Sequence, residues 1–468
     1  MKLFGTDGIR GIPGRYPLDP ETLRRVSRAV GENLLSEFSA KNGAPPLAVL
    51  GQDSRASGPR LASLVATGLS GAGLALRDAG VISTPAVSHL TRRLGAVLGV
   101  SVSASHNPAR FNGVKFFSSD GLKLTSEKER LIEEGLASPS PRTTRLSPLP
   151  APRFPFESLQ PRRIDSAAEL YSEFLRSTLS PYADLRGLKL VVDCANGAAS
   201  RVAPEIFRSL GASVLPMACK PDGQNINLDC GALHPESMRR QVLKSGADCG
   251  VAFDGDADRV LLSDERGRLW DGDAIMGFCA LRLKSLGLLR RDAVVTTVMS
   301  NYGFLKFLKE NGISNLSVPV GDRCVSEALA QADLSLGGEP SGHVVFRDLA
   351  GTGDGLLTAL QVLGFARESG RPLSALKPAY SPVPQVILNV PSSAKPPLED
   401  LPGFQKILRH WEKALEGRGR VLARYSGTEP ILRIMVEAPE APRVRMIAKA
   451  LSGTYRKETQ EEEAVHEI

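Results

Sequence analysis

Long apolar runs are missing from this sequence of 468 residues. No stretch of about 18 uncharged apolar residues occurs, so we expect no membrane-spanning helix. The opening residues MKLFGTDGIR contain neither an apolar core nor a small-residue cleavage site, so we expect no signal peptide. The hydrophobic content of 42% is ordinary for a globular protein, and the length suggests about three or four domains.

Cysteine is scarce, and its spacing excludes the common cysteine frameworks. The chain has six cysteines and no Cys-x-x-Cys pair, so neither a zinc site nor a disulfide scaffold is expected. Free and mostly buried thiols are typical of a reducing compartment, which favours a cytoplasmic protein.

Aromatic residues and clustered basic residues are also few. Aromatics make up 5% of the chain, and no run of five or more Lys or Arg occurs, although the net charge is +7. This pattern argues against nucleic acid as a partner. An excess of arginine around a site for small anions such as phosphates would also explain the charge.

Alternating strand and helix patterns divide the chain into three β-α-β units and a smaller mixed unit. A Pro-rich stretch at 138–157 reads as a linker, because many prolines cannot lie inside a helix or a strand ladder. A second Pro-rich run, 378–397, precedes the last unit. We expect four domains, with bounds 1–157, 158–262, 263–374 and 375–468. Each unit places one polar loop after a strand, and four such loops meeting at one cleft would build a site between domains.

Ser105 and His106 follow an apolar strand predicted at 96–102, and Pro108 then forces a turn. The carboxyl end of a strand in an α/β sheet is where ligands bind. By itself, however, a Ser-His pair favours an ordinary turn that carries a solvated hydroxyl, and only the rest of the chain changes that interpretation.

The segment DGDADR places Asp254, Asp256 and Asp258 at alternate positions, and an extended backbone would turn all three carboxylates to one side. Three close carboxylates repel one another unless a cation neutralises them, and oxygen ligands alone favour Mg²⁺. An EF-hand is excluded because Leu261 and Leu262 stand where further ligands would be needed. The alternative is a polar turn capped by Arg259.

Three further loops carry groups that suit a sugar phosphate. RYSGTEP offers backbone amides and hydroxyls beside Arg424 and Arg433, as a phosphate cradle would. GGEPSGH holds a carboxylate, a hydroxyl and His343, which could move a proton. FGTDGIRG combines glycines with Arg10, which suits an anion. By itself, RYSGTEP could be a hairpin turn with two surface arginines, GGEPSGH a Gly-Pro turn with His343 exposed at the surface, and FGTDGIRG an N-terminal strand with a flexible start. Their combination on a repeated α/β frame favours an active site.

These motifs, together with SASHNP, VGDR and TGDG, resemble in order and spacing the α-D-phosphohexomutase superfamily, over essentially the whole chain. The resemblance implies an α/β fold with three similar α/β domains of mixed sheets and a smaller C-terminal α+β domain around a central cleft. FGTDGIRG, VGDR and TGDGLLTALQVL are most similar to the bacterial branch that acts on glucosamine phosphates. That branch interconverts glucosamine 6-phosphate and glucosamine 1-phosphate, toward UDP-N-acetylglucosamine and the cell wall.

The resemblance also assigns roles. Ser105 would carry the phosphoryl group as a phosphoserine, and one Mg²⁺ per chain would be held by Ser105 and the three aspartates of DGDADR. A sugar bisphosphate would serve as intermediate and activator. The implied catalytic residues are Ser105, His106, Lys115, Arg10 and His343. The implied substrate-binding residues are Arg259, Glu339, Ser341 and His343. The implied phosphate-binding residues are Arg424, Ser426, Gly427, Thr428 and Arg433. Members of the superfamily are often dimers, so a homodimer is a further expectation.

Three residues depart from the pattern of that branch. Ala257 replaces a common glycine in the metal loop, Pro340 replaces a common glutamine in the sugar loop, and Cys324 replaces a tyrosine after VGDR. Pro340 lies in the loop that, by the resemblance, contacts the substituent at C2 of the sugar. The departure therefore concerns which sugar phosphate is preferred and not the class of reaction.

Three alternatives remain open from the sequence. The first is a mutase of the same superfamily that acts on mannose or glucose phosphates. The second is a phosphoserine-dependent phosphatase, against which the distal phosphate cradle argues, since hydrolysis needs no reorientation of the substrate. The third is a non-catalytic sugar-phosphate binder, against which the intact Ser105 and aspartates argue.

Overall fold

The computed structural model describes residues 3–5, 7–36, 45–137, 161–179, 184–378, 380–426, 430–460 and 466–467. These residues form two compact units: Met1–Met299 with Ile313–Pro378, and Ser300–Gly312 with Ala379–Ile468. The Pro-rich stretch 138–157 lies outside the described residues. Among the helices that the structure describes, none is long and apolar enough to cross a membrane.

The first unit contains three mixed sheets. The first has, in spatial order, β1 (Ile9–Gly11), β5 (Asn112–Ser118), β4 (Leu98–Val102), β2 (Leu47–Gln52), β3 (Ala75–Val81) and β6 (Arg162–Arg163). The second has β11 (Leu269–Trp270), β10 (Val260–Asp264), β9 (Cys249–Phe253), β7 (Lys189–Asp193) and β8 (Ser213–Met217). The third has β13 (Ser314–Val318), β12 (Ala293–Thr297), β14 (Leu336–Gly338) and β15 (Val344–Phe346).

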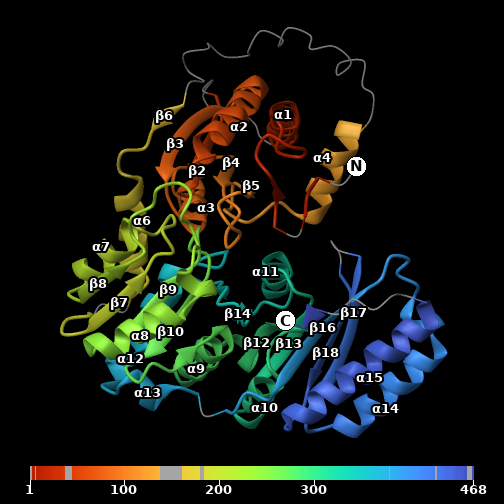
Figure 1. Cartoon of the computed structure of the whole chain (residues 1–468). Helices are drawn as coiled ribbons and strands as arrows, with labels where there is room; N and C mark the ends of the chain where they lie inside the picture. The colour runs from red at the N-terminus through yellow and green to blue at the C-terminus, as the bar shows by residue number, and fades with distance from the viewer. Residues whose placement is uncertain are drawn as a thin grey trace. The chain divides into compact units, whose positions relative to one another are not determined.

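The helices of this unit connect and cover those strands (Figure 1). Their bounds are α1 (Pro20–Ser36), α2 (Gly58–Ala72), α3 (Thr84–Arg93), α4 (Ser126–Ala137), α6 (Ala167–Ser177), α7 (Val202–Ser209), α8 (Glu236–Ser245), α9 (Gly272–Ser285), α11 (Asp322–Gln331), α12 (Gly355–Ser369) and α13 (Leu373–Leu376), with the 3₁₀ turns η1 (Gly231–Leu233) and η2 (Arg290–Asp292).

One strand order occurs three times. In each sheet three parallel strands are followed by one antiparallel strand, as β3-β2-β4-β5, β8-β7-β9-β10 and β13-β12-β14-β15. The loop between the last parallel strand and its antiparallel neighbour therefore occupies an equivalent place in all three sheets. These loops are β4–β5, β9–β10 and β14–β15, and they contain Ser105, the three aspartates and His343 respectively.

Local sequence explains where several helices begin and end. Proline starts α2 and Gly73 ends it in the left-handed region (φ 97°), where its N–H bonds back to the last turn. Asp354 caps the N-terminus of α12 through the amide of Leu357. The helix α11 begins within the VGDR motif, at Asp322. Gly321 adopts φ 141° just before it and lets the chain turn into the helix.

The second unit is a small antiparallel sheet with helices packed against it (Figure 1). The strands, in spatial order, are β17 (Arg420–Tyr425), β18 (Ile431–Glu437), β16 (Gln385–Pro391) and β19 (His466–Glu467). The helices are α10 (Tyr302–Glu310), α14 (Pro402–Leu415) and α15 (Ala441–Thr459), with the turn η3 (Leu398–Asp400). Alternate apolar residues of β16 pack with α14 and α15 in one core. Three mixed α/β sheets and a smaller α+β unit confirm the predicted fold class.

Candidate active site

Ser105 lies in the β4–β5 loop with its side chain buried, at 1% exposure. Its Oγ donates a hydrogen bond to Asp254 Oδ2 over 2.6 Å, and Nδ1 of His106 lies 3.4 Å from the same Oγ. Burial, with the charges of Arg259 and Arg10, lowers the pKa of His106 to about 4. The imidazole is therefore neutral at pH 7 and can accept a proton from, or share one with, this hydroxyl.

The metal-loop carboxylates meet as predicted, but the predicted reason is wrong. Residues 254–258 form a turn and not an extended strand: the amide of Ala257 donates to Asp254 O, and Ala257 adopts φ 57°. A turn brings Asp254, Asp256 and Asp258 together because it closes the backbone around their side chains. One oxygen of each lies within 4.8 Å of the others, and all three residues are buried.

Lys115 is the internal counter-ion of this cluster. Its Nζ lies 2.9 Å from Asp256 Oδ2, 3.3 Å from Asp258 Oδ2 and 3.1 Å from Asp7 Oδ2, and the side chain is 1% exposed. Burial by itself lowers the pKa of Lys115, but the carboxylates outweigh burial and raise that pKa well above its usual value. The ammonium is thus held charged and immobile at the floor of the site.

The three aspartates are not electrostatically equivalent. Burial and the neighbouring Asp258 and Asp256 raise the pKa of Asp254 well above its usual range. Burial also acts on Asp258, but Lys115 and His343 outweigh it and hold the pKa of Asp258 well below its usual range. Asp254 therefore bears the repulsion of its two neighbours, whereas Lys115 stabilises the charged form of Asp258.

The residues present fit a divalent cation. Within the described part of the chain, Asp256 Oδ1 and Asp258 Oδ1 are buried and receive no hydrogen bond. A buried carboxylate oxygen without a donor is costly, and a cation removes that cost. The donor set is oxygen alone, which Mg²⁺ prefers.

Glu339, Ser341 and His343 occupy the equivalent β14–β15 loop. Glu339 is 6% exposed; its Oε1 accepts the Gly321 amide over 2.9 Å and its Oε2 accepts Ser341 Oγ over 3.1 Å. The sugar loop is thereby tied to the start of α11. The hydroxyl and carboxylate nevertheless remain beside each other, as a polar pair that can bind sugar hydroxyls.

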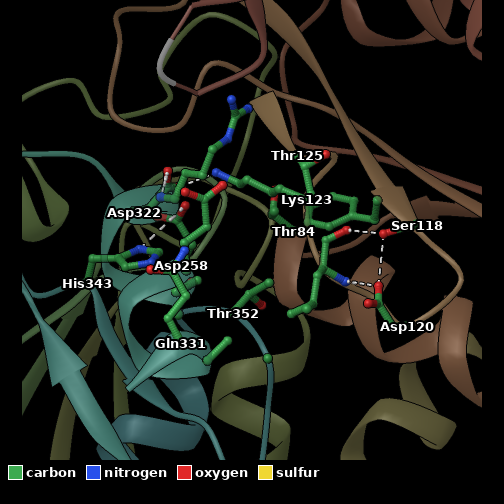
Figure 2. Close-up of a pocket in the computed structure, with 18 residues that line it drawn as sticks. Thr84, Ser118, Asp120, Lys123, Thr125, Asp258, Asp322, Gln331, His343 and Thr352 are labelled. Atoms are coloured by element: carbon green, nitrogen blue, oxygen red, sulfur yellow. Dashed lines mark hydrogen bonds and ion pairs between the residues drawn. The ribbon is translucent and has the colours of Figure 1, made fainter. Parts of the chain in front are cut away.

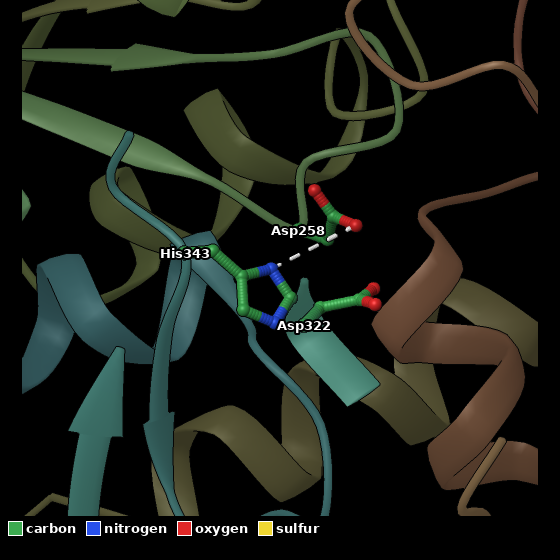
Figure 3. Close-up of side chains that lie close together, drawn as sticks. All are labelled: Asp258, Asp322 and His343. Carbon is green, nitrogen blue, oxygen red and sulfur yellow. Dashed lines mark ion pairs between the residues drawn. The ribbon is translucent and has the colours of Figure 1, made fainter. Parts of the chain in front are cut away.

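His343 is buried at 3% exposure, which rules out the surface position that the sequence left open. Figure 3 shows its ring turned toward Asp258 and Asp322, with Nδ1 3.9 Å from Asp258 Oδ2. Burial by itself lowers the pKa of His343, but Asp258 raises it above its usual value. Among the described residues, Nε2 has no hydrogen-bond partner.

Arg10 and Arg259, two further predicted site residues, lie near the Ser105 loop and the metal loop respectively. Arg10 Nη2 pairs with Asp7, and its Nη1 lies 3.5 Å from Asn107 Oδ1 in the Ser105 loop. Arg259 Nε lies 3.9 Å from Asp258 Oδ1, and about a fifth of its side chain stays exposed. Both guanidiniums are therefore next to the carboxylate cluster.

Sequence reasoning missed a second set of ionic contacts around Asp7. Lys123 Nζ bridges Asp7 and Asp322, and Arg323 pairs with Glu129 at 2.5 and 2.7 Å. The sequence signal for these contacts was the charged pair in VGDR, a motif from which only the family branch was predicted. In the structure, its Asp322 and Arg323 tie α11 to the first sheet and to α4.

A cavity of about 230 Å³ opens beside His343 (Figure 2). Its walls come from the β5–α4 segment, from α11 and from residues 351–353, and its lining is mainly apolar. Lys123, Asp258 and Asp322 supply charged groups at one side.

The TGDG motif fixes the place of the His343 ring. A Cβ added to Gly353 would overlap that ring, and one added to Gly355 would lie 2.6 Å from Arg259 O. The Gly355 amide donates to Ala257 O over 3.0 Å, and the Tyr171 hydroxyl donates to both oxygens of Asp354 at 2.8–2.9 Å. TGDG therefore packs against the sugar loop and the metal loop at once.

The buried carboxyl group of Asp354 is expected to make the free energy of unfolding depend on pH. Burial raises its pKa to about 6 in the folded chain, against about 3.9 unfolded. Between pH 4 and 6 the unfolded chain releases this proton first, so Asp354 makes the folded state less stable as pH rises, by about 3 kcal/mol in total. Asp354→Asn cannot ionise, and we expect its stability relative to wild type to improve across that range. Urea unfolding of both proteins from pH 4 to 7 measures this, and a pH-independent difference would contradict it.

The predicted phosphate cradle lies in the second unit. Arg424 and Arg433 are direct partners on β17 and β18, and burial and Arg433 lower the pKa of Arg424. Ser426 follows β17, and its carbonyl accepts Lys395 Nζ over 2.6 Å, which adds a cation that sequence reasoning missed. Gly427 and Thr428 lie outside the described residues. Adjacent like charges of this kind are stabilised by a bound anion.

Comparison with known proteins agrees with this arrangement. Residues 1–142, 169–267 and 271–382 match the phosphoglucomutase/phosphomannomutase alpha/beta/alpha domains I, II and III, and residues 387–453 match the C-terminal domain of that family. Phosphoglucosamine mutases of Bdellovibrio bacteriovorus and of a Geobacter species are 39% and 43% identical. The alignments cover 98% of both chains in the first case and 97% of both in the second.

The chain belongs to the phosphoglucosamine mutase family. Solved structures of lower identity share the fold of this family member. A phosphoglucomutase/phosphomannomutase family protein of Burkholderia thailandensis superposes with TM-score 0.77 at 24% identity over 97% of both chains. An Aspergillus fumigatus N-acetylphosphoglucosamine mutase, in complex with GlcNAc-6P and magnesium, gives TM-score 0.61 at 18% identity over 98% of this chain and 96% of that one.

Proposed function

We propose that this protein is an isomerase that interconverts glucosamine 6-phosphate and glucosamine 1-phosphate through a phosphoserine at Ser105. The observation that carries the proposal is the buried Ser105 hydroxyl 2.6 Å from Asp254, beside Asp256 and Asp258, in a chain of this family. To move a phosphoryl group between two positions of a sugar, the serine must first carry a phosphoryl group itself.

The reaction is a phosphoryl exchange between Ser105 Oγ and the sugar. The bond between phosphorus and Ser105 Oγ breaks, a bond to the free sugar hydroxyl forms, and the hydroxyl proton passes to a base. The resulting glucosamine bisphosphate reverses its orientation in the site. It then returns its other phosphoryl group to Ser105. Because each half is a phosphoryl transfer, catalysis consists mainly of positioning and of stabilising charge.

Asp254, Asp256 and Asp258 would hold one Mg²⁺, together with an oxygen of the Ser105 phosphoryl group. When bound, the ion supplies stabilisation of negative charge on the transferring group. Lys115 keeps Asp256 and Asp258 oriented from below, and Arg259 and Arg10 offer further positive charge. His343, whose Nε2 is unpartnered in the described structure, is the group that we assign to proton exchange with the sugar hydroxyl.

Glu339 and Ser341 would bind sugar hydroxyls, and Arg424, Ser426 and Arg433 would hold the phosphate that does not react, with Gly427 and Thr428 completing the cradle. A cradle that binds either phosphate group suits an intermediate that reverses its orientation. We also propose a cytoplasmic enzyme and a homodimer; light scattering of the purified chain tests the oligomeric state.

The test is a coupled mutase assay with Mg²⁺ and a trace of sugar bisphosphate. Glucosamine, glucose and mannose phosphates are compared side by side, and we expect a clear preference for glucosamine phosphate. A preference for glucose or mannose phosphate would overturn the sugar assignment and direct attention to Pro340. Release of inorganic phosphate without isomerisation would replace the mutase by a phosphatase.

Gly353→Ala provides a separate check on His343. The new Cβ would overlap the His343 ring, so the ring must shift, and a shift of about 1 Å can lower turnover about 10²-fold. Gly351→Ala is the matched control, because its Cβ would meet only the flexible end of the Leu122 side chain. Equal kcat values for the two variants would remove His343 from the proposed proton exchange.

A further inference from the structure

Arg55 is a buried guanidinium directly beneath the Ser105 loop. It is 1% exposed, and each of its five N–H donors has an acceptor. The acceptors are Asp53 Oδ2 for Nε at 2.9 Å, the carbonyls of Pro108 and Phe111 for Nη1 at 2.6 and 2.9 Å, and the carbonyls of Ser105 and Asn107 for Nη2 at 2.9 and 2.7 Å. Four loop carbonyls thus converge on one side chain.

A closed ring of hydrogen bonds runs through both backbone groups of Ser105. Its amide donates to Ser103 Oγ over 2.9 Å, Ser103 Oγ donates to Asp53 Oδ2 over 2.6 Å, and Asp53 binds Arg55. Arg55 then closes the ring on the carbonyl of Ser105. With the N–H and the C=O both held, the backbone dihedral angles of Ser105 are constrained.

The constraint matters because Ser105 has φ 50°, a left-handed conformation that costs a residue with a Cβ about 1–2 kcal/mol. Such conformations persist where the surroundings over-determine them. The ring of hydrogen bonds, made by residues that follow strands of the first sheet, holds Ser105 in this conformation. Asn227 adds to it from the second, since its Nδ2 donates to the same Ser105 carbonyl over 2.9 Å.

We propose that Arg55, paired with Asp53, is the positioning residue that holds Ser105 in its left-handed conformation and aims its Oγ at the metal loop. Arg55 does not touch the reacting atoms, since its contacts are to Asp53 and to loop carbonyls. This inference rests on the proposed function for its effect on turnover, and on the loop geometry alone for its effect on structure.

The variant that tests it is Arg55→Lys, which keeps the charge but replaces a planar fork of five donors by an ammonium with three. The matched control is Arg268→Lys. Arg268 pairs with the buried Asp264 at 2.8 Å and donates to Ser374 O at 2.7 Å, in the second sheet of the same unit. Both substitutions remove an arginine fork from a buried carboxylate, but only the first lies under Ser105.

Two readouts separate positioning from general stability. Amide hydrogen exchange over residues 103–112 is expected to rise at least about tenfold in Arg55→Lys and to stay unchanged in Arg268→Lys. The kcat of the mutase assay is expected to fall about 10²-fold in Arg55→Lys, with KM within threefold of wild type. Ser103→Ala removes the acceptor of the Ser105 amide and the hydrogen bond to Asp53, but it leaves the Arg55 contacts in place. It should lower kcat in the same manner but less, and it decides the matter if Arg55→Lys does not fold.

Unchanged exchange over residues 103–112, or equal kcat losses in Arg55→Lys and Arg268→Lys, would overturn the inference. If wild type isomerises none of the three sugar phosphates, the proposed function fails. The hydrogen-exchange comparison still decides whether Arg55 holds the loop.

Discussion

Ser105→Ala is expected to lower mutase turnover by at least about 10⁴-fold, because the variant has no atom to carry the phosphoryl group. The change is small in volume, and the fold should survive it. The variant loses the hydrogen bond to Asp254 Oδ2 and the longer contact with His106 Nδ1. Burial with two neighbouring carboxylates already raises the pKa of Asp254. Asp254 can therefore take up a proton in place of the lost donor.

Ser263→Ala is the matched control for this variant. Ser263 is equally buried in the same unit, and its hydroxyl donates to the carbonyl of Asp264. Both variants are assayed with glucosamine 6-phosphate, and phosphorylation is followed by intact mass. Turnover retained in Ser105→Ala, or a phosphorylated Ser105→Ala chain with activity, would refute the phosphoserine mechanism.

The second large effect is expected for Lys115→Met, on stability. Removing one partner from a buried ionic cluster leaves uncompensated charge and costs about 3–5 kcal/mol. Here the ammonium serves Asp7, Asp256 and Asp258 within 3.3 Å. The loss should be greatest with chelator present, and added Mg²⁺ should restore part of it, since the cation neutralises the carboxylates that Lys115 leaves behind.

The control here is Lys284→Met, which breaks a partly exposed pair with Asp292 at 3.2 Å and should cost less than about 1 kcal/mol. Urea unfolding is followed for both variants with chelator and with millimolar Mg²⁺. If Lys115→Met loses no more stability than Lys284→Met, the ammonium is not the counter-ion described above. If Mg²⁺ stabilises Lys115→Met no more than wild type, the cation does not replace the positive charge of the lost ammonium. If Mg²⁺ stabilises neither protein, the carboxylates do not hold the cation.

Much of the candidate site could be predicted from short segments. The loops with Ser105, with the three aspartates and with His343 were all placed after strands, and the structure puts them at equivalent positions of three repeated sheets. Such predictions succeed because turn chemistry and strand patterning act over a few residues. The same local rules explain α2, whose proline start and glycine end are visible in the sequence.

Where local rules failed, a backbone conformation or a distant contact decided the outcome. The aspartates meet through a turn at Ala257 and not through an extended strand. The helix α11 starts inside VGDR, where Gly321 turns the chain.

By itself the sequence determined the candidate site residues of this protein. They are a serine, three carboxylates and a histidine, each in a loop after a strand, and the pair Arg424 and Arg433, which lie on strands. Tertiary structure decided which charges face one another. Lys115 meets Asp256 from 141 residues away, Lys123 meets Asp322 from 199 away, and Arg55 closes on the Ser105 carbonyl from 50 away. Pairing over such separations depends on how the sheets pack and on which side chains lose water together, and no local pattern in the chain encodes that.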